Sequence, residues 1–129
     1  MKTSSGIDFV AAQVSGAGGT GTAKYLALTA NSTAPSTADT TLSGEIVTGG
    51  GGLVRALATY AHTAGTSTYT LSNTFTANGS DSLPVTVAKI GVFNAASAGT
   101  LVFETLLSST ATLTASGDSV VVTDTVTIS

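Results

Sequence analysis

Two β-strands joined by a short turn are predicted between residues 88 and 107, where the chain is richest in apolar and aromatic side chains. The run LVFETLL alternates from residue 101 onward and places Phe103 and Glu104 on opposite faces, which is typical of a strand. The preceding residues AASAG are small enough to close a tight turn. No catalytic motif accompanies this hairpin, so the stretch indicates architecture and assembly.

Similar short alternating runs, separated by turn residues, recur along the whole chain. Residues 53–62 fit either a helix or a strand, and the hairpin turn that follows them favours a strand. No amphipathic helix is available for parallel crossovers, so we expect antiparallel pairing. The remaining expected strands are residues 7–14, 24–29, 44–47, 67–77, 84–94, 100–107, 108–114 and 119–128.

These signals predict one all-β domain over residues 1–129, an antiparallel β-sandwich of eight or nine strands with a jelly-roll-like or Greek-key topology. Three segments are expected to lie outside the strands. We expect residues 1–6 to form a flexible N-terminal arm and residues 15–21 to form a glycine-rich loop. Residues 30–52 are polar, turn-rich and glycine-rich, and predict a long loop region of the kind that is usually functional or packed against a partner.

Charged residues make up only 9% of this chain, against about 25% in an average globular protein. The hydrophobic content of 42% and the net charge of −3 argue against disorder, which requires low hydropathy and high net charge. Strong net charge helps to keep proteins soluble and monomeric. A surface this neutral therefore indicates a subunit of an assembly, covered in part by its neighbours.

The sequence offers little for catalysis or for cofactors. It has no cysteine and a single histidine, His62, which disfavours zinc, and no G-x-S-x-G motif is present. The seven acidic residues are scattered; a glycosidase pair stays open, but three tyrosines and no tryptophan make a poor sugar cleft. We expect no enzyme, no catalytic, metal or cofactor-binding residue, and no cofactor.

Nucleic acid and membrane are not expected partners either. Four basic residues in a chain of net charge −3 provide no electrostatic footprint for a phosphate backbone. No segment approaches the roughly 20 apolar residues that span a bilayer.

Three charged residues, Arg55, Lys89 and Glu104, interrupt otherwise apolar strands. Such a charge either faces solvent or is paired across strands or across a subunit boundary. Because such charges are rarely fully buried, facing solvent is the ordinary expectation. The more specific alternative is a ladder pair between Lys89 and Glu104, which flank the same hairpin.

Four stretches of the chain resemble a group of small tailed-bacteriophage virion proteins, described as capsid decoration (cement) or tail-associated proteins. The resemblance covers about residues 24–129 and implies a β-sandwich or jelly-roll subunit in a symmetric oligomer, with no functional residue to carry over. The stretches are YLALT (25–29), STADTTLSGE (36–45), GLVRALATYAHTAGTSTYTLSNTFTA (52–77) and VAKIGVFNAASAGTLVFETLL (87–107).

From this resemblance we expect a virion protein on the capsid surface that bridges subunits of the major capsid protein, as a homo-oligomer and preferably a trimer. The alternatives are a tail or fibre component and a carbohydrate-binding module for host recognition. The expected interface comprises the N-terminal arm, the long loop and the strand charges. Its candidate residues are Met1, Lys2, Gly6, Pro35, Asp39, Gly50, Arg55, Lys89 and Glu104.

Overall fold

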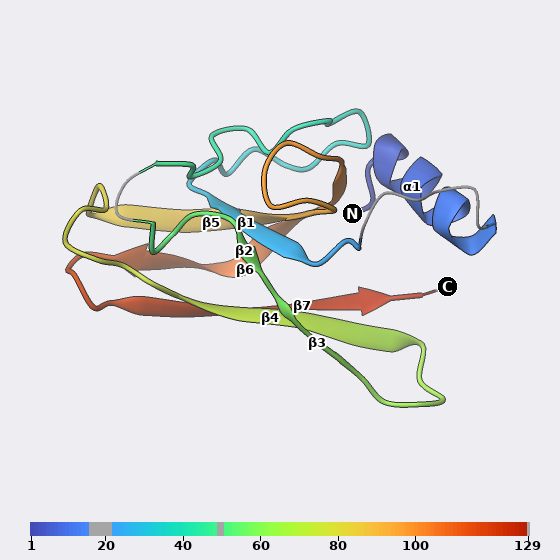
Figure 1. The fold of residues 1–129 in the computed structure, drawn as a ribbon. Helices are drawn as coiled ribbons and strands as arrows, with labels where there is room; N and C mark the ends of the chain where they lie inside the picture. The colour runs from blue at the N-terminus through green and yellow to red at the C-terminus, as the bar shows by residue number, and fades with distance from the viewer. Residues whose placement is uncertain (16–21, 49–50, 129) are drawn as a thin grey trace.

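The computed structural model describes residues 1–15, 22–48 and 51–128. Over these ranges the chain forms one helix and seven strands, and the strands make two stacked antiparallel sheets (Figure 1). The elements in chain order are α1 (Ser4–Ser15), β1 (Tyr25–Thr29), β2 (Ala56–Leu57), β3 (Thr59–His62), β4 (Thr68–Thr76), β5 (Val85–Phe93), β6 (Leu101–Leu113) and β7 (Ser119–Thr127).

Sheet A has the strand order β2-β1-β5-β6, and sheet B has the order β3-β4-β7. The chain passes from sheet A to sheet B at Ala58, a buried residue between β2 and β3. The all-β antiparallel prediction is confirmed, but eight or nine strands was wrong. Residues 7–14 are not a strand, residues 100–107 and 108–114 form the single long strand β6, and residues 53–62 divide into β2 and β3. Residues 44–47 contribute only one bridge, between Thr29 and Glu45.

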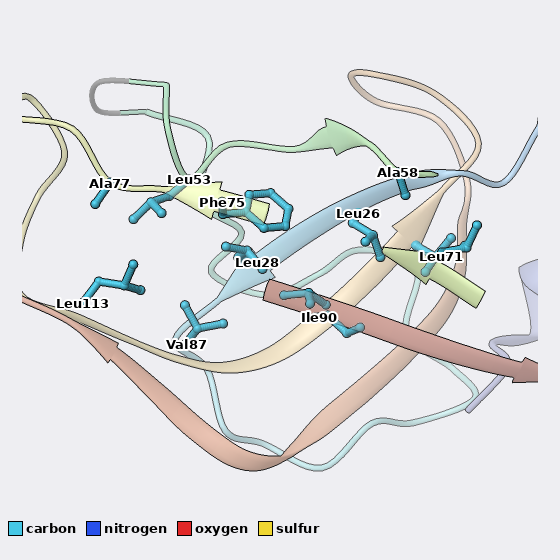
Figure 2. Close-up of a cluster of buried hydrophobic side chains, with 12 residues drawn as sticks. Leu26, Leu28, Leu53, Ala58, Leu71, Phe75, Ala77, Val87, Ile90 and Leu113 are labelled. Atoms are coloured by element: carbon cyan, nitrogen blue, oxygen red, sulfur yellow. The ribbon is translucent and has the colours of Figure 1, made fainter. Parts of the chain in front are cut away.

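The main core lies between the two sheets, where the inward residues of each strand meet (Figure 2). Leu26 and Leu28 of β1 are fully buried, and Leu71 and Phe75 of β4 reach them from the opposite sheet. Both pairs follow the alternation visible in the sequence. Burying a leucine or phenylalanine side chain contributes about 1.5–3 kcal/mol each, so these contacts hold the sheets together.

A second, smaller apolar layer lies on the outer side of sheet A. Residues 30–48, which we call the covering segment, cross this face (Figure 1), and Leu42 packs there against Ala27, Phe93 and Leu101. The backbone N–H of Ile46 donates to the Leu28 carbonyl at 2.9 Å, which ties the end of the segment to β1. Sheet A is therefore covered on both faces.

Residues 7–14 are helical, so the predicted first strand was wrong. Thr3 precedes α1 and caps it: its Oγ1 accepts the Gly6 N–H at 2.9 Å and donates to the Leu101 carbonyl at 2.5 Å. A hydroxyl that satisfies a free N–H in the first turn favours a helix start. Ile7 and Val10 remain exposed, so only part of the helix faces the protein.

The first residues pair with β6 and do not extend as the expected arm. Lys2 bridges antiparallel to Phe103, and the Glu104 N–H donates to the Met1 carbonyl at 3.0 Å. This pairing covers part of the β6 edge, because edge strands carry free backbone groups that need partners. The expected glycine-rich loop at residues 15–21 lies, apart from Ser15, outside the described residues. In the part of the chain that is described, the helix is too short and too polar to cross a membrane.

Candidate functional site

A buried ion pair joins β5 and β6 beneath the covering segment. Lys89 Nζ lies 2.7 Å from Glu104 Oε1, and the side chains are only 2% and 1% exposed. Lys89 Nζ also donates to the Thr33 carbonyl of the covering segment at 3.1 Å. Of the two alternatives left open by the sequence, the structure shows the ladder pair; the ordinary expectation of solvent-facing charges is wrong for Lys89 and Glu104, which are buried within the molecule.

The second carboxyl oxygen of Glu104 does not take part in the ion pair with Lys89. Glu104 Oε2 is buried and no N–H or hydroxyl of the described residues donates to it, although buried carboxylate oxygens normally have a partner; the Asp39 carboxyl lies within hydrogen-bond reach of the Glu104 carboxyl. Burial raises the pKa of the Glu104 carboxyl, opposed by the hydrogen bond from Lys89 and reinforced by Asp39. The proton is therefore held more tightly by Glu104 than by a free glutamate.

Asp39 is the third ionisable group of this cluster and comes from the covering segment. The Ser36 N–H donates to Asp39 Oδ2 at 2.9 Å, and this bond lowers the pKa of Asp39, helped by Glu104 and by the charge of Lys89. The two carboxyls thus have pKa values that are moved apart, with the buried one raised and the half-exposed one lowered. Of the two, Glu104 is therefore the first to take up a proton as the pH falls.

Arg55 forms a second charge cluster near the β5–β6 turn. Its Nε and Nη2 donate to the two Glu45 carboxylate oxygens at 2.9 and 2.7 Å, and its guanidinium lies 3.5 Å from the Phe93 ring centroid. Nη1 also donates to the carbonyls of Ala95 and Ala98 at 3.0 and 2.7 Å. A planar fork suits this bidentate arrangement, which joins the covering segment to the turn.

The candidate interface residues are distributed over separate parts of the molecule. Met1, Lys2 and Gly6 lie along β6, and a Cβ at Gly6 would overlap the Val102 carbonyl. Gly50 lies outside the described residues. The others lie in or beneath the covering segment: Pro35, Asp39, Arg55, Lys89 and Glu104.

The outer face of sheet B has a different character, because no charged side chain lies on it. Strand register and alternation place its members on the side opposite Leu71 and Phe75, where they are exposed or half-exposed. We call it the threonine face; its residues are Thr59, Ala61, Thr68, Thr70, Ser72, Thr74, Thr76, Ser119, Val121, Thr123, Thr125 and Thr127.

Asp124 is a buried carboxyl that the interface prediction did not include. It lies on β7 and lines a hollow of about 210 Å³ between β6 and β7, beside Phe103 and Thr105. Burial raises its pKa, opposed by the N-terminal amino group. The sequence did carry a signal, since Asp124 occurs in the inward phase of the alternation, between Val122 and Val126.

Catalytic and metal chemistry find little support among the described residues. His62 is exposed at the end of β3, with Nδ1 2.8 Å from the Thr68 carbonyl. No group of three or more histidine, cysteine, aspartate or glutamate side chains is placed to hold a metal ion within the described ranges.

Comparison of the chain with protein-family models, with curated proteins and with solved structures finds no match. Functional inference therefore depends on the features above: two charge clusters that fix the covering segment, and an uncharged face on the opposite sheet.

Proposed function

We propose that this chain is a non-enzymatic structural protein of a bacteriophage virion, and that it decorates the capsid by bridging neighbouring subunits of the major capsid protein. The observation that carries the proposal is the threonine face, an uncharged sheet surface without any covering element of its own among the described residues. The resemblance of the sequence to small phage virion proteins supplies the biological setting.

A face of this composition suits contact with another protein. Charged residues are depleted in the cores of protein interfaces, because burying an unpaired charge is costly. Threonine has a methyl group for packing and a hydroxyl that can find a partner, so burial of the face requires no charge to lose its water. Val121, which is 67% exposed, provides an apolar contact near the start of β7.

The expected contact residues need to be reassigned within this proposal. Lys89 and Glu104 are buried, and Arg55 is held by Glu45 and by backbone carbonyls, so these side chains are engaged within the subunit. We infer that they make the subunit rigid and that the threonine face makes the contact. A rigid surface loses less conformational freedom on binding.

Symmetric assembly would strengthen a modest contact. Three copies around a symmetry axis would present three identical faces, and the second and third contacts would form at high effective concentration. A trimer placed where capsid subunits meet could therefore bind tightly through small individual interfaces.

Binding of the purified protein to capsids that lack it tests the proposal. Thr74→Arg and Thr123→Arg each add one charge to an exposed position of the threonine face, whereas Ser80→Arg adds the same charge to an exposed turn. An unpaired charge in a buried interface costs about 3 kcal/mol, or about 100-fold in affinity. Unchanged binding by both face variants would rule out the threonine face as the contact.

The copy number on whole particles distinguishes the decoration role from the tail alternative. A decoration protein is present over the entire capsid, and its removal lowers the temperature at which heads break. A tail component is present in few copies, and its loss leaves the heads unchanged.

A further inference from the structure

We propose that Lys89 and Glu104 become joined by an amide cross-link between the Lys89 Nζ and the Glu104 side-chain carbonyl, which fastens β5 to β6 covalently. The reacting groups are already in contact, since Nζ lies 2.7 Å from Oε1. They come from adjacent strands, with Lys89 opposite Leu106 and Glu104 opposite Gly91, so the link would span one diagonal of the ladder.

The surroundings favour a neutral product over an ion pair. Both side chains are at least 98% buried, beneath the covering segment and beside an apolar layer that includes Leu42 and Leu101. Taking a lysine and a glutamate out of water costs several kcal/mol per ion, and their attraction repays this only when every polar atom is satisfied. An amide carries no charge, and the water it releases can leave the site.

The unpartnered oxygen is the second observation. Glu104 Oε2 is buried and accepts no hydrogen bond from an N–H or hydroxyl of the described residues, which is unfavourable for a carboxylate. Amide formation expels one carboxyl oxygen as water and turns the buried carboxylate into a neutral carbonyl, whose burial costs less than that of a charge. The Thr33 carbonyl, which accepts from Nζ at 3.1 Å, can accept the remaining N–H of the amide.

Asp39 is placed to move protons in this reaction. It lies beside Glu104, and the Ser36 N–H bonds to its Oδ2, so it is available as an ionised base. Two neighbouring carboxyls whose pKa values are moved apart form an arrangement in which a proton can be exchanged between them. Asp39 therefore acts as the acid–base group, Glu104 as the acceptor and Lys89 as the nucleophile.

The reaction balances without any other reagent. A proton passes from the Lys89 ammonium to the Glu104 carboxylate, which leaves a neutral amine facing a neutral acid. The Nζ lone pair attacks Cδ, and the Asp39 carboxylate takes a proton from Nζ and returns it to the hydroxyl oxygen of the adduct. The bond from Cδ to that oxygen breaks, one water leaves, and nothing is oxidised or reduced.

Mass spectrometry of the intact, denatured full-length protein tests the proposal directly. We expect a mass that is one water molecule lower than the sequence requires. Trypsin then localises the link, because the basic residues are only Lys2, Lys24, Arg55 and Lys89. An acylated Lys89 is not cleaved, so residues 56–129 should appear as one fragment lacking one water, separate from residues 25–55.

The alternative outcomes are equally distinct. A full-length mass together with cleavage after Lys89 would overturn the proposal. If residues 25–55 stay attached to residues 56–129, Asp39 is the acceptor, and the assignment of Glu104 is wrong. These measurements use the unmodified chain, so they do not depend on whether any variant folds.

Two variants identify the roles of the residues. Lys89→Arg keeps the positive charge but removes the amine, so this variant should have the mass calculated from its sequence, without loss of water. Asp39→Asn keeps the shape of the side chain but removes the base, so freshly purified protein should contain a mixture of linked and unlinked chains whose linked fraction rises with time. A complete and immediate loss of water in Asp39→Asn would exclude Asp39 as the acid–base group.

Discussion

Gly91 on β5 lies directly opposite Glu104 on β6, so the carboxyl-bearing residue faces a partner that has no side chain. The space above Gly91 is occupied by Leu42 of the covering segment and by Leu101. A Cβ at Gly91 would lie 3.1 Å from Leu101 Cδ1 and 3.2 Å from Leu42 Cδ2. This glycine therefore allows a buried ionic group and an apolar layer to share the same face of sheet A.

Gly91→Ala is expected to lower the free energy of unfolding by about 1–3 kcal/mol, because an added methyl in a filled layer forces its neighbours to move. Urea denaturation followed by circular dichroism measures the change. Gly79→Ala is the matched control, since no atom lies within 4 Å of a Cβ at that position. Equal free energies of unfolding for the two variants would show that Leu42 and Leu101 can move aside without loss of stability.

A double-mutant cycle on Arg55 and Glu45 should give a coupling free energy of about 1–3 kcal/mol, as expected for partners in a shared hydrogen-bond network. The two side chains are only 9% and 12% exposed, so solvent screens their interaction weakly. Urea denaturation of Arg55→Ala, Glu45→Ala and the double variant provides the measurement. A coupling near zero would mean that Arg55 stabilises the protein mainly through Phe93 and the carbonyls of the turn.

Thr3→Val is expected to destabilise the protein by about 1–2 kcal/mol, because it removes the helix cap and a buried hydrogen bond while keeping the shape of the side chain. Hydrogen exchange should show the loss first in the amides of α1. Thr112→Val is the control, since its hydroxyl bonds to that of Thr86 at an exposed position. A wild-type exchange pattern in α1 would contradict the capping role.

Asp124 should make the protein less stable as the pH rises. Burial raises the pKa of Asp124 in the folded state above that in the unfolded chain, so the folded state binds its proton more tightly. The stability this provides is complete below the unfolded pKa, near 3.9, and is lost as the pH rises through the folded pKa. Asp124→Asn should flatten this part of the profile.

Urea denaturation of wild type and Asp124→Asn between acidic and neutral pH measures that difference. The variant should be the more stable protein at neutral pH, and its advantage should shrink toward acidic pH. Parallel profiles would show that the Asp124 carboxyl is hydrated in the hollow between β6 and β7.

Much of the strand arrangement could be predicted from the sequence, because sheet positions that alternate in burial also alternate in polarity. The alternation within β4 and within β7 follows their sequences, but the pairing of these two strands, which places their threonines opposite one another, could not be predicted from spacing. The pairing of Lys89 with Glu104 was one of two alternatives that the sequence left open, since both residues interrupt apolar strands of one hairpin. Their burial could not be predicted, because it depends on the covering segment.

Other parts carry weaker signals. Helix α1 depends on the cap at Thr3 and on contacts at Gly6, and a short run such as IDFVAAQV fits either period. The sequence of the covering segment shows neither helical nor strand periodicity. The segment is attached to sheet A by Leu42, by a backbone carbonyl that accepts from Lys89, and by the two charge clusters. Its role appears only when residues distant in the sequence are brought together.

The covering segment makes the outer face of sheet A different from the outer face of sheet B. One sheet is sealed by the chain itself, and the other ends in bare hydroxyls and methyls. Copies that bury the bare side against a larger body must all turn the sealed side outward. A layer built from them would therefore have a fixed polarity, decided by a stretch of chain that belongs to neither sheet.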